Sequence, residues 1–246
     1  MDYSTIQSNK ILRQYAREQL QGVWGKMAFA FFILFLIYLP HTIISNLGSL
    51  LETQISFLQD LSYFVASALA ELYTSIPGFP SIAIISLILT IAVFTVSGPF
   101  DLGLAGYFLK RVRGEEIFTK NIFDGFKQFP RSFLLMLLIC IFIFLWTLLL
   151  IIPGVIKSFS YSMAFYIMYD NPEIKASEAL EKSKIMMNGY KWKLLLLSLS
   201  FIGWGILSLL TLGIGFFWLR PYVGLTIANF YENLKINQGA QETVDH

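Results

Sequence analysis

Residues 132–169 constrain the fold of this chain more than any other stretch. They form two long apolar runs that meet at Ile152-Pro153-Gly154, and Lys157 is the only clearly charged side chain between the flanks. The first run is about twenty residues, enough at ~1.5 Å per helical residue to cross a hydrocarbon core of roughly 30 Å. Runs this long and this uniformly apolar are unlike the alternating strands of a membrane barrel. The stretch therefore predicts a transmembrane helical hairpin with a tight turn.

The composition of the whole chain also indicates a polytopic membrane protein. Charged residues make up 14% of it and the mean hydropathy is +0.63, whereas soluble domains average about 25% charge. The single cysteine, Cys140, excludes an intrachain disulfide and a cysteine-based metal site. The first apolar run begins after about 26 largely polar residues and no small-x-small cleavage site follows it, so we expect a retained span.

Hydropathy predicts six transmembrane helices in one all-α integral membrane domain over residues 1–234. The spans fall at about residues 27–45, 81–109, 132–152, 155–170, 192–212 and 216–234. Residues 46–80 form a long outer loop that has acidic residues but no Lys or Arg, and residues 235–246 form a polar tail. Gly98-Pro99 interrupts the second span, which predicts a kink there.

Residues 3–24 are amphipathic and predict a helix that Ser8 or Asn9 can cap. Its bases Lys10, Arg13 and Arg17 fall on one face at i, i+3 and i+7. Two placements of this helix stay open. It lies in the headgroup layer, where its bases meet anionic lipid, or it forms a solvated cap packed on the rest of the protein.

The basic residues sort to one side of the six-span arrangement. They precede the first span, separate spans two and three, separate spans four and five, and follow span six; only Lys157 and Arg220 escape this pattern. The positive-inside rule then places both termini in the cytoplasm. The same bases suit anionic lipid on the cytoplasmic side, so a nucleic-acid partner need not be invoked.

The spans group into three pseudo-repeated hairpins, each preceded by an amphipathic interfacial segment. Each odd span follows a glycine, an aromatic residue and a base, as in Gly125-Phe126-Lys127. The even spans align at Pro99-Phe100, Ser160-Tyr161 and Pro221-Tyr222. Glycines at helical spacing predict close helix contacts at Gly103, Gly106, Gly203, Gly205 and Gly224.

Three long motifs carry a resemblance to a known family. They are GPFDLGLAGYFLKRVRGEE from Gly98, IIPGVIKSFSYSMAFYIMYDNPEIKASEALEKSKIMMNGYKWKL from Ile151, and FIGWGILSLLTLGIGFFWLRPYVGLTIANFYENL from Phe201. The chain resembles the bacterial integral membrane family catalogued as domain of unknown function 975. A fainter likeness is to the membrane region of glycerophosphodiester phosphodiesterases. The resemblance implies a multi-pass protein of the bacterial cytoplasmic membrane and implies no activity.

Intramembrane charge supplies the candidate site. Counting from the basic or acidic ends of the even spans places Asp101, Lys157 and Arg220 at similar depth, with Tyr161 and Tyr222 as supporting aromatics. An ionised group at a helix centre costs ~2.5–3.5 kcal/mol, so such residues usually pair or line a cavity. We expect Asp101 to pair with Arg220 near Lys157 and to hold an anionic group such as a lipid phosphate. Alternatively, the two bases reach the outer headgroups and Asp101 is satisfied locally.

Three functions fit these features. The first is a non-enzymatic membrane protein that engages lipid or a membrane partner protein, and the second is a transporter or channel for a small or lipid-like anion. The third, an intramembrane enzyme, is the least favoured. The sequence shows no nucleotide-binding loop, metal-spaced cluster or nucleophile–base set, so we expect no catalytic residues, no metal and no cofactor.

Overall fold

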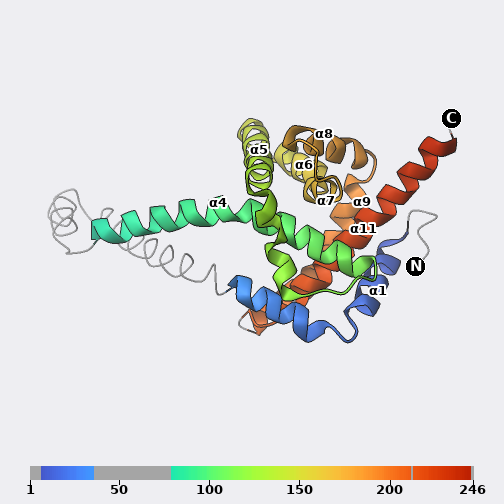
Figure 1. Ribbon diagram of the computed structural model, residues 1–246, viewed down its shortest axis with the longest axis horizontal. Helices are drawn as coiled ribbons and strands as arrows, with labels where there is room; N and C mark the ends of the chain where they lie inside the picture. The colour runs from blue at the N-terminus through green and yellow to red at the C-terminus, as the bar shows by residue number, and fades with distance from the viewer. Residues whose placement is uncertain (1–6, 36–78, 212, 245–246) are drawn as a thin grey trace. The chain divides into compact units, whose positions relative to one another are not determined.

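The computed structural model describes residues 7–35, 79–211 and 213–244 (Figure 1). Within these ranges every regular element is a helix, as the predicted all-α class requires. The chain forms two compact units, one of Met1–Phe32 with Ser97–His246 and one of Ile33–Val96. Several predicted features lie outside the described residues: nearly all of the 46–80 loop, residues 36–45 of the first span, residues 3–6 of the amphipathic segment and the last two residues of the tail.

Among the described residues, three helices are long and apolar enough to cross a membrane: Leu87–Val112, Thr119–Leu149 and Lys191–Leu210. Large apolar side chains on them face outward, and Leu148 and Leu210 are 74% and 75% exposed. Such surfaces are favourable against lipid and unfavourable in water. A shorter apolar helix, Trp24–Phe35, covers the beginning of the first predicted span. Six separate spans, the repeat and the orientation remain predictions.

Helix α4 runs from Phe79 to Val112, and Pro99 lies inside it without ending it. Its second half packs closely on the helical turn η1 (Thr119–Gln128) and on α5 (Phe129–Leu149). A Cβ atom at Gly98 would overlap the backbone of Ser132, and one at Gly103 would overlap the backbone of Ile122. Glycine is therefore what allows these backbones to touch.

The predicted glycine contacts are confirmed at three positions and wrong at two. Besides Gly103, a Cβ at Gly106 would overlap the ring of Tyr169, and one at Gly224 would overlap the ring of Phe108. No atom lies within 4 Å of a Cβ built at Gly203 or Gly205. Both sit on α10 (Ile202–Leu210), and no described atom beyond their own helix makes such a close approach.

The central hairpin turns earlier than the sequence predicts. An extended residue, Leu150 (φ −161°, ψ 142°), separates α5 from α6 (Ile151–Tyr161). Pro153 lies in the first turn of α6, where a backbone N–H has no intrahelical acceptor and its loss costs little. A Cβ at Gly154 would overlap Thr147 on α5, so this glycine lets the two helices lie close together.

Helices α7 (Ala164–Asp170) and α8 (Ala176–Met186) complete the group around α6. The buried hydroxyl of Ser183 on α8 donates to the carbonyl of Ser160 at 2.9 Å and accepts from the amide of Met163 at 3.2 Å. It thereby satisfies backbone groups freed where α6 ends and α7 begins. Asn171 caps the end of α7, and its side-chain amide donates to the carbonyl of Ile167 at 2.8 Å.

The last helix, α11 (Phe216–Val244), follows α9 (Lys191–Leu199) and α10. It continues past the predicted end of the sixth span. Helix α1 (Asn9–Leu20) packs on it (Figure 1). The Ser8 side chain accepts from the Ile11 amide at 3.4 Å, which confirms the predicted cap.

Buried amides lock this contact. Gln19 and Asn229 exchange hydrogen bonds of 3.2 and 2.7 Å, and the Asn233 side chain accepts from the amide of Gln7 at 2.8 Å. Leu12 and Leu20 are fully buried. The structure therefore shows α1 packed on the rest of the protein, and its placement in the headgroup layer stays a prediction.

Candidate functional site

A cavity of about 650 Å³ lies within the first unit, in the size range of small-ligand sites. Its wall comes chiefly from α4 and α11, and α6, α7, α9 and the short helix that contains Phe31 add further residues. Most of the lining is apolar, and aromatic side chains are prominent in it: Phe31, Phe108, Phe159, Phe165, Tyr166 and Phe216. The polar groups of the wall are few: Asp101, Ser158, Ser162, Ser198 and Arg220.

Two of the predicted site residues, Asp101 and Arg220, line this one cavity. Asp101 comes from α4, directly after the Gly98-Pro99 step, and Arg220 comes from the first turns of α11. Both side chains have accessible surface. Among the described residues no ion pair joins them. The cavity thus presents one acid and one base to whatever enters it.

The third predicted charge, Lys157, is not among the described lining residues. Its ammonium group lies over the ring of Trp146, 4.5 Å from the centroid, which is a cation–π contact. Its neighbour in sequence, Ser158, does reach the cavity. The predicted cluster of one acid and two bases is therefore brought together in part.

The two predicted supporting aromatics pack against other rings. Tyr161 is 6% exposed, and its ring lies 6.2 Å from that of Phe142. Tyr222 lies edge-on to Phe201, with 5.2 Å between the centroids. Neither tyrosine is among the cavity's lining residues, although Tyr222 lines a separate groove on the other side of α11.

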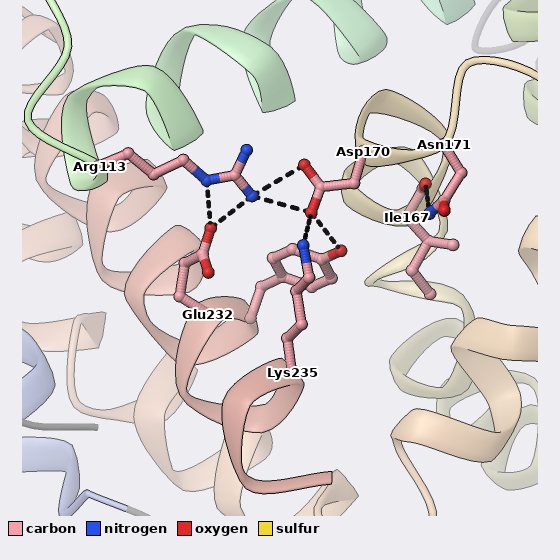
Figure 2. A network of polar contacts seen from close by, with 7 residues as sticks. Arg113, Ile167, Asp170, Asn171, Glu232 and Lys235 are labelled. Carbon is pink, nitrogen blue, oxygen red and sulfur yellow. Dashed lines mark hydrogen bonds and ion pairs between the residues drawn. The ribbon is translucent and has the colours of Figure 1, made fainter. Parts of the chain in front are cut away.

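A network of charged side chains joins the C-terminal end of α4 to α7 and α11, three helices that contribute to the cavity wall (Figure 2). The guanidinium of Arg113, directly after α4, contacts both Asp170 on α7 and Glu232 on α11. Asp170 also accepts from Lys235 at 2.5 Å and from the hydroxyl of Tyr231 at 3.0 Å. We call the four residues Arg113, Asp170, Glu232 and Lys235 the charge clamp.

The charge clamp is balanced, and its acids are the buried members. The side chains of Asp170 and Glu232 are only 5% and 10% exposed, against 33% and 47% for Arg113 and Lys235. Burial acts to raise the pKa of the Asp170 carboxyl, but hydrogen bonds from Lys235 and Arg113 outweigh it and hold that pKa below its usual range. The Asp170 carboxylate is therefore charged in the folded protein and depends on its bases.

The charge clamp is not predicted by the sequence patterns. In the sequence, Arg113 and Lys235 belong to the basic residues that indicate orientation, and Asp170 and Glu232 lie near the ends of predicted spans. Their contacts join positions 57, 119 and 65 residues apart. A usable signal was the presence of acids at the basic side of spans four and six, where an unpaired carboxylate would be exceptional.

The site offers binding groups and no cluster of metal ligands. Within the described ranges, no three His, Cys, Asp or Glu side chains lie close enough together to hold a metal ion. What the cavity does combine is an acid, a base and several hydroxyls within apolar walls. That combination can hold an amphiphile by its polar end.

Comparison with known proteins places the chain in a family. Neither the curated proteins nor the solved structures contain a significant match to it. The fainter likeness to the membrane region of glycerophosphodiester phosphodiesterases is not shown by these comparisons. One family model does match, over residues 1–157 and again over residues 147–238, which together cover most of the sequence. The chain belongs to the family described as Protein of unknown function (DUF975).

Proposed function

We propose that this protein is a non-enzymatic, multi-pass protein of the bacterial cytoplasmic membrane that binds a membrane lipid in the cavity between α4, α7 and α11. Both termini lie inside the cell in this proposal, and the six predicted spans form the three hairpins. Three helices long and apolar enough to cross a membrane support the location. The excess of bases in the predicted inner loops supports the orientation.

The single observation that carries the proposal is that Asp101 and Arg220 line the same apolar-walled cavity. Charged side chains are costly within a membrane protein and persist there where they have a partner or a ligand. An acid and a base that are not paired with each other suit a lipid headgroup that carries both an amine and a phosphate. The aromatic and aliphatic wall suits the acyl chains of the same molecule.

Lipid analysis of the purified protein tests this proposal. The protein is purified in a mild non-ionic detergent, and the phospholipid that remains bound is extracted and counted per protein by mass spectrometry. We expect the variant Asp101→Asn with Arg220→Gln to lose the phospholipid of the cavity, so that it retains fewer phospholipids per protein than the natural sequence does. Lys157→Gln is the matched control, because Lys157 is a neighbouring base of the same predicted cluster that does not line the cavity. Equal lipid content in all three proteins would overturn the proposal.

Transport of a small or lipid-like anion is a second candidate, and the placement of Arg220 in the cavity favours it. Liposomes that contain the purified protein separate the two functions. A transporter would release a trapped anion, or move a labelled lipid between leaflets, faster than empty liposomes do. A binding protein would retain lipid in the extraction experiment without any such flux.

A further inference from the structure

A second concave surface lies on the other side of α11 from the cavity. It is a groove of about 630 Å³ between α1, α10 and α11, and Leu219 contributes to both linings. We call it the basic groove, because three of its lining residues are Lys10, Arg13 and Arg17. The rest of its lining is Trp24, Trp204, Leu207, Ser208, Thr211, Gly215, Trp218, Leu219 and Tyr222. It therefore combines cations from α1 with aromatic side chains from α10, α11 and the helix Trp24–Phe35.

The three cations face the groove without counterions. No hydrogen bond or ion pair from Lys10, Arg13 or Arg17 to any described residue occurs, and the described lining contains no carboxylate. The Nε atom of Arg13 is buried and has no hydrogen-bond acceptor among the described residues. Like charges three or four positions apart repel each other on a helix. An anion placed among these side chains would relieve that repulsion and satisfy the buried donor.

The tryptophans of the groove indicate that the bound anion also has an apolar part. Trp24, Trp204 and Trp218 line the groove together, and Trp204 and Trp218 are about half exposed. Tryptophan presents a large apolar surface with one polar edge, which is why it gathers at the level of lipid headgroups. A small soluble anion would leave this apolar wall in water. A molecule with an anionic head and a hydrocarbon body would cover it.

We propose that the basic groove binds an anionic phospholipid. The phosphate lies among Lys10, Arg13 and Arg17, where arginine can contact two phosphate oxygens at once. The glycerol and acyl chains lie along the tryptophans. This site is separate from the cavity that holds Asp101 and Arg220, so it stands or fails independently of the function proposed above.

Tryptophan quenching by brominated lipids tests this inference directly. The chain has five tryptophans, so replacing Trp146 and Trp192 by Phe leaves the three that line the groove. This protein is reconstituted in phosphatidylcholine vesicles that contain a rising fraction of phosphatidylglycerol with brominated acyl chains. A parallel series uses brominated phosphatidylcholine. Bromine quenches a tryptophan only on close approach, so quenching beyond the bulk fraction reports preferential binding at the groove.

We expect phosphatidylglycerol to bind roughly tenfold or more tightly than phosphatidylcholine, since each base near a phosphate contributes about 1 kcal/mol. Replacing Lys10, Arg13 and Arg17 together by Gln should bring the two lipids close to equal affinity. Replacing Lys175, Lys182 and Lys184, three exposed bases of the α8 region, is the matched control and should keep the preference. The variant with Arg13→Lys and Arg17→Lys keeps the charges and should retain most of the preference.

Three results would overturn the inference. The first is equal quenching of the groove tryptophans by both lipids in the protein that keeps its three bases. The second is an unchanged preference for phosphatidylglycerol in the Gln variant. The third is loss of the preference when soluble glycerol phosphate is added, because phosphate alone would then be the ligand. Gel filtration and thermal unfolding of each variant show that a lost preference reflects the groove rather than a failure to fold.

Discussion

The guanidinium of Arg113 donates to both carboxylate oxygens of Asp170 at 2.8 Å, across 57 positions of the chain. The same guanidinium donates through Nε to Glu232 at 2.6 Å. One side chain thus neutralises two carboxylates that are almost fully buried. The stability of the first unit should depend on it more than on any exposed base.

Replacing Arg113 by Met should destabilise the protein by about 3–5 kcal/mol, because it leaves two buried carboxylates short of a counterion. Thermal unfolding in detergent measures the effect. Arg17→Met is the matched control, because Arg17 is exposed and has no ion pair among the described residues, and it should change stability by less than about 0.5 kcal/mol. Equal losses in the two variants would contradict the charge clamp.

The charge clamp should also weaken in acid. Since the pKa of Asp170 is lower in the folded protein than its usual value, the unfolded chain binds this proton more tightly. The stability that Asp170 contributes is then fully present above its usual pKa, and it is lost as the pH falls toward the lower folded value. The gap in melting temperature between the natural protein and Asp170→Asn should be wide at about pH 7 and shrink below about pH 4. A gap that does not change with pH would rule this out.

Two glycine-to-alanine substitutions distinguish the effect of close backbone packing on stability from the effect of helix propensity. Gly103→Ala forces a methyl group into the Ile122 backbone and should destabilise by about 1–3 kcal/mol. Gly203→Ala places the same methyl group in open space and should be neutral or stabilising by up to about 1 kcal/mol. Thermal unfolding of the two variants in one detergent decides the matter, and the opposite order would refute the packing of α4 on η1.

The buried amides that join α1 to α11 predict a coupled pair of substitutions. Gln19→Leu or Asn229→Leu alone removes the two hydrogen bonds that these buried amides exchange and should cost about 1–3 kcal/mol. The double variant should cost less than the sum, because neither amide is then left behind. Additive losses in the double-mutant cycle would show that the two side chains act separately.

The predicted orientation can be checked with reporter fusions. Alkaline phosphatase folds only outside the bacterial cytoplasm, so a fusion after Asp60 should be active and a fusion after Lys182 should be inactive. A fluorescent protein that folds in the cytoplasm should give the reverse result at both positions. The same assignments follow from the placement of basic residues. Activity after Lys182 would invert the topology.

Hydropathy was sufficient to predict helices, because apolar runs such as α5 leave the backbone no other way to satisfy its hydrogen bonds in lipid. It did not place the turn before α6. Proline is tolerated both in a turn and in the first turn of a helix, so Pro153 could not distinguish the two. Gly103 and Gly203 likewise look the same in the sequence, and only their neighbours in space differ.

The candidate site was predictable only where one helix decides the position. Counting residues along α4 and α11 put Asp101 and Arg220 at similar depth, and the structure places both in one cavity. Such a count does not predict the direction in which a side chain points around the helix axis. Lys157 turns toward Trp146 on the neighbouring helix, and no count of residues from the end of a span could have shown that.

The order of synthesis gives the contacts of α11 a further meaning. A ribosome releases the N-terminus first, so α1 emerges long before Asn229 and Asn233, to which it is bonded. Arg113 and Asp170 can meet early, but Glu232 and Lys235 join them last. A chain that stops short of α11 would therefore lack the buried amide contacts of its first helix and would have an incomplete set of counterions. The contacts of α1 and of the charge clamp are therefore completed only when α11 has been synthesised and inserted.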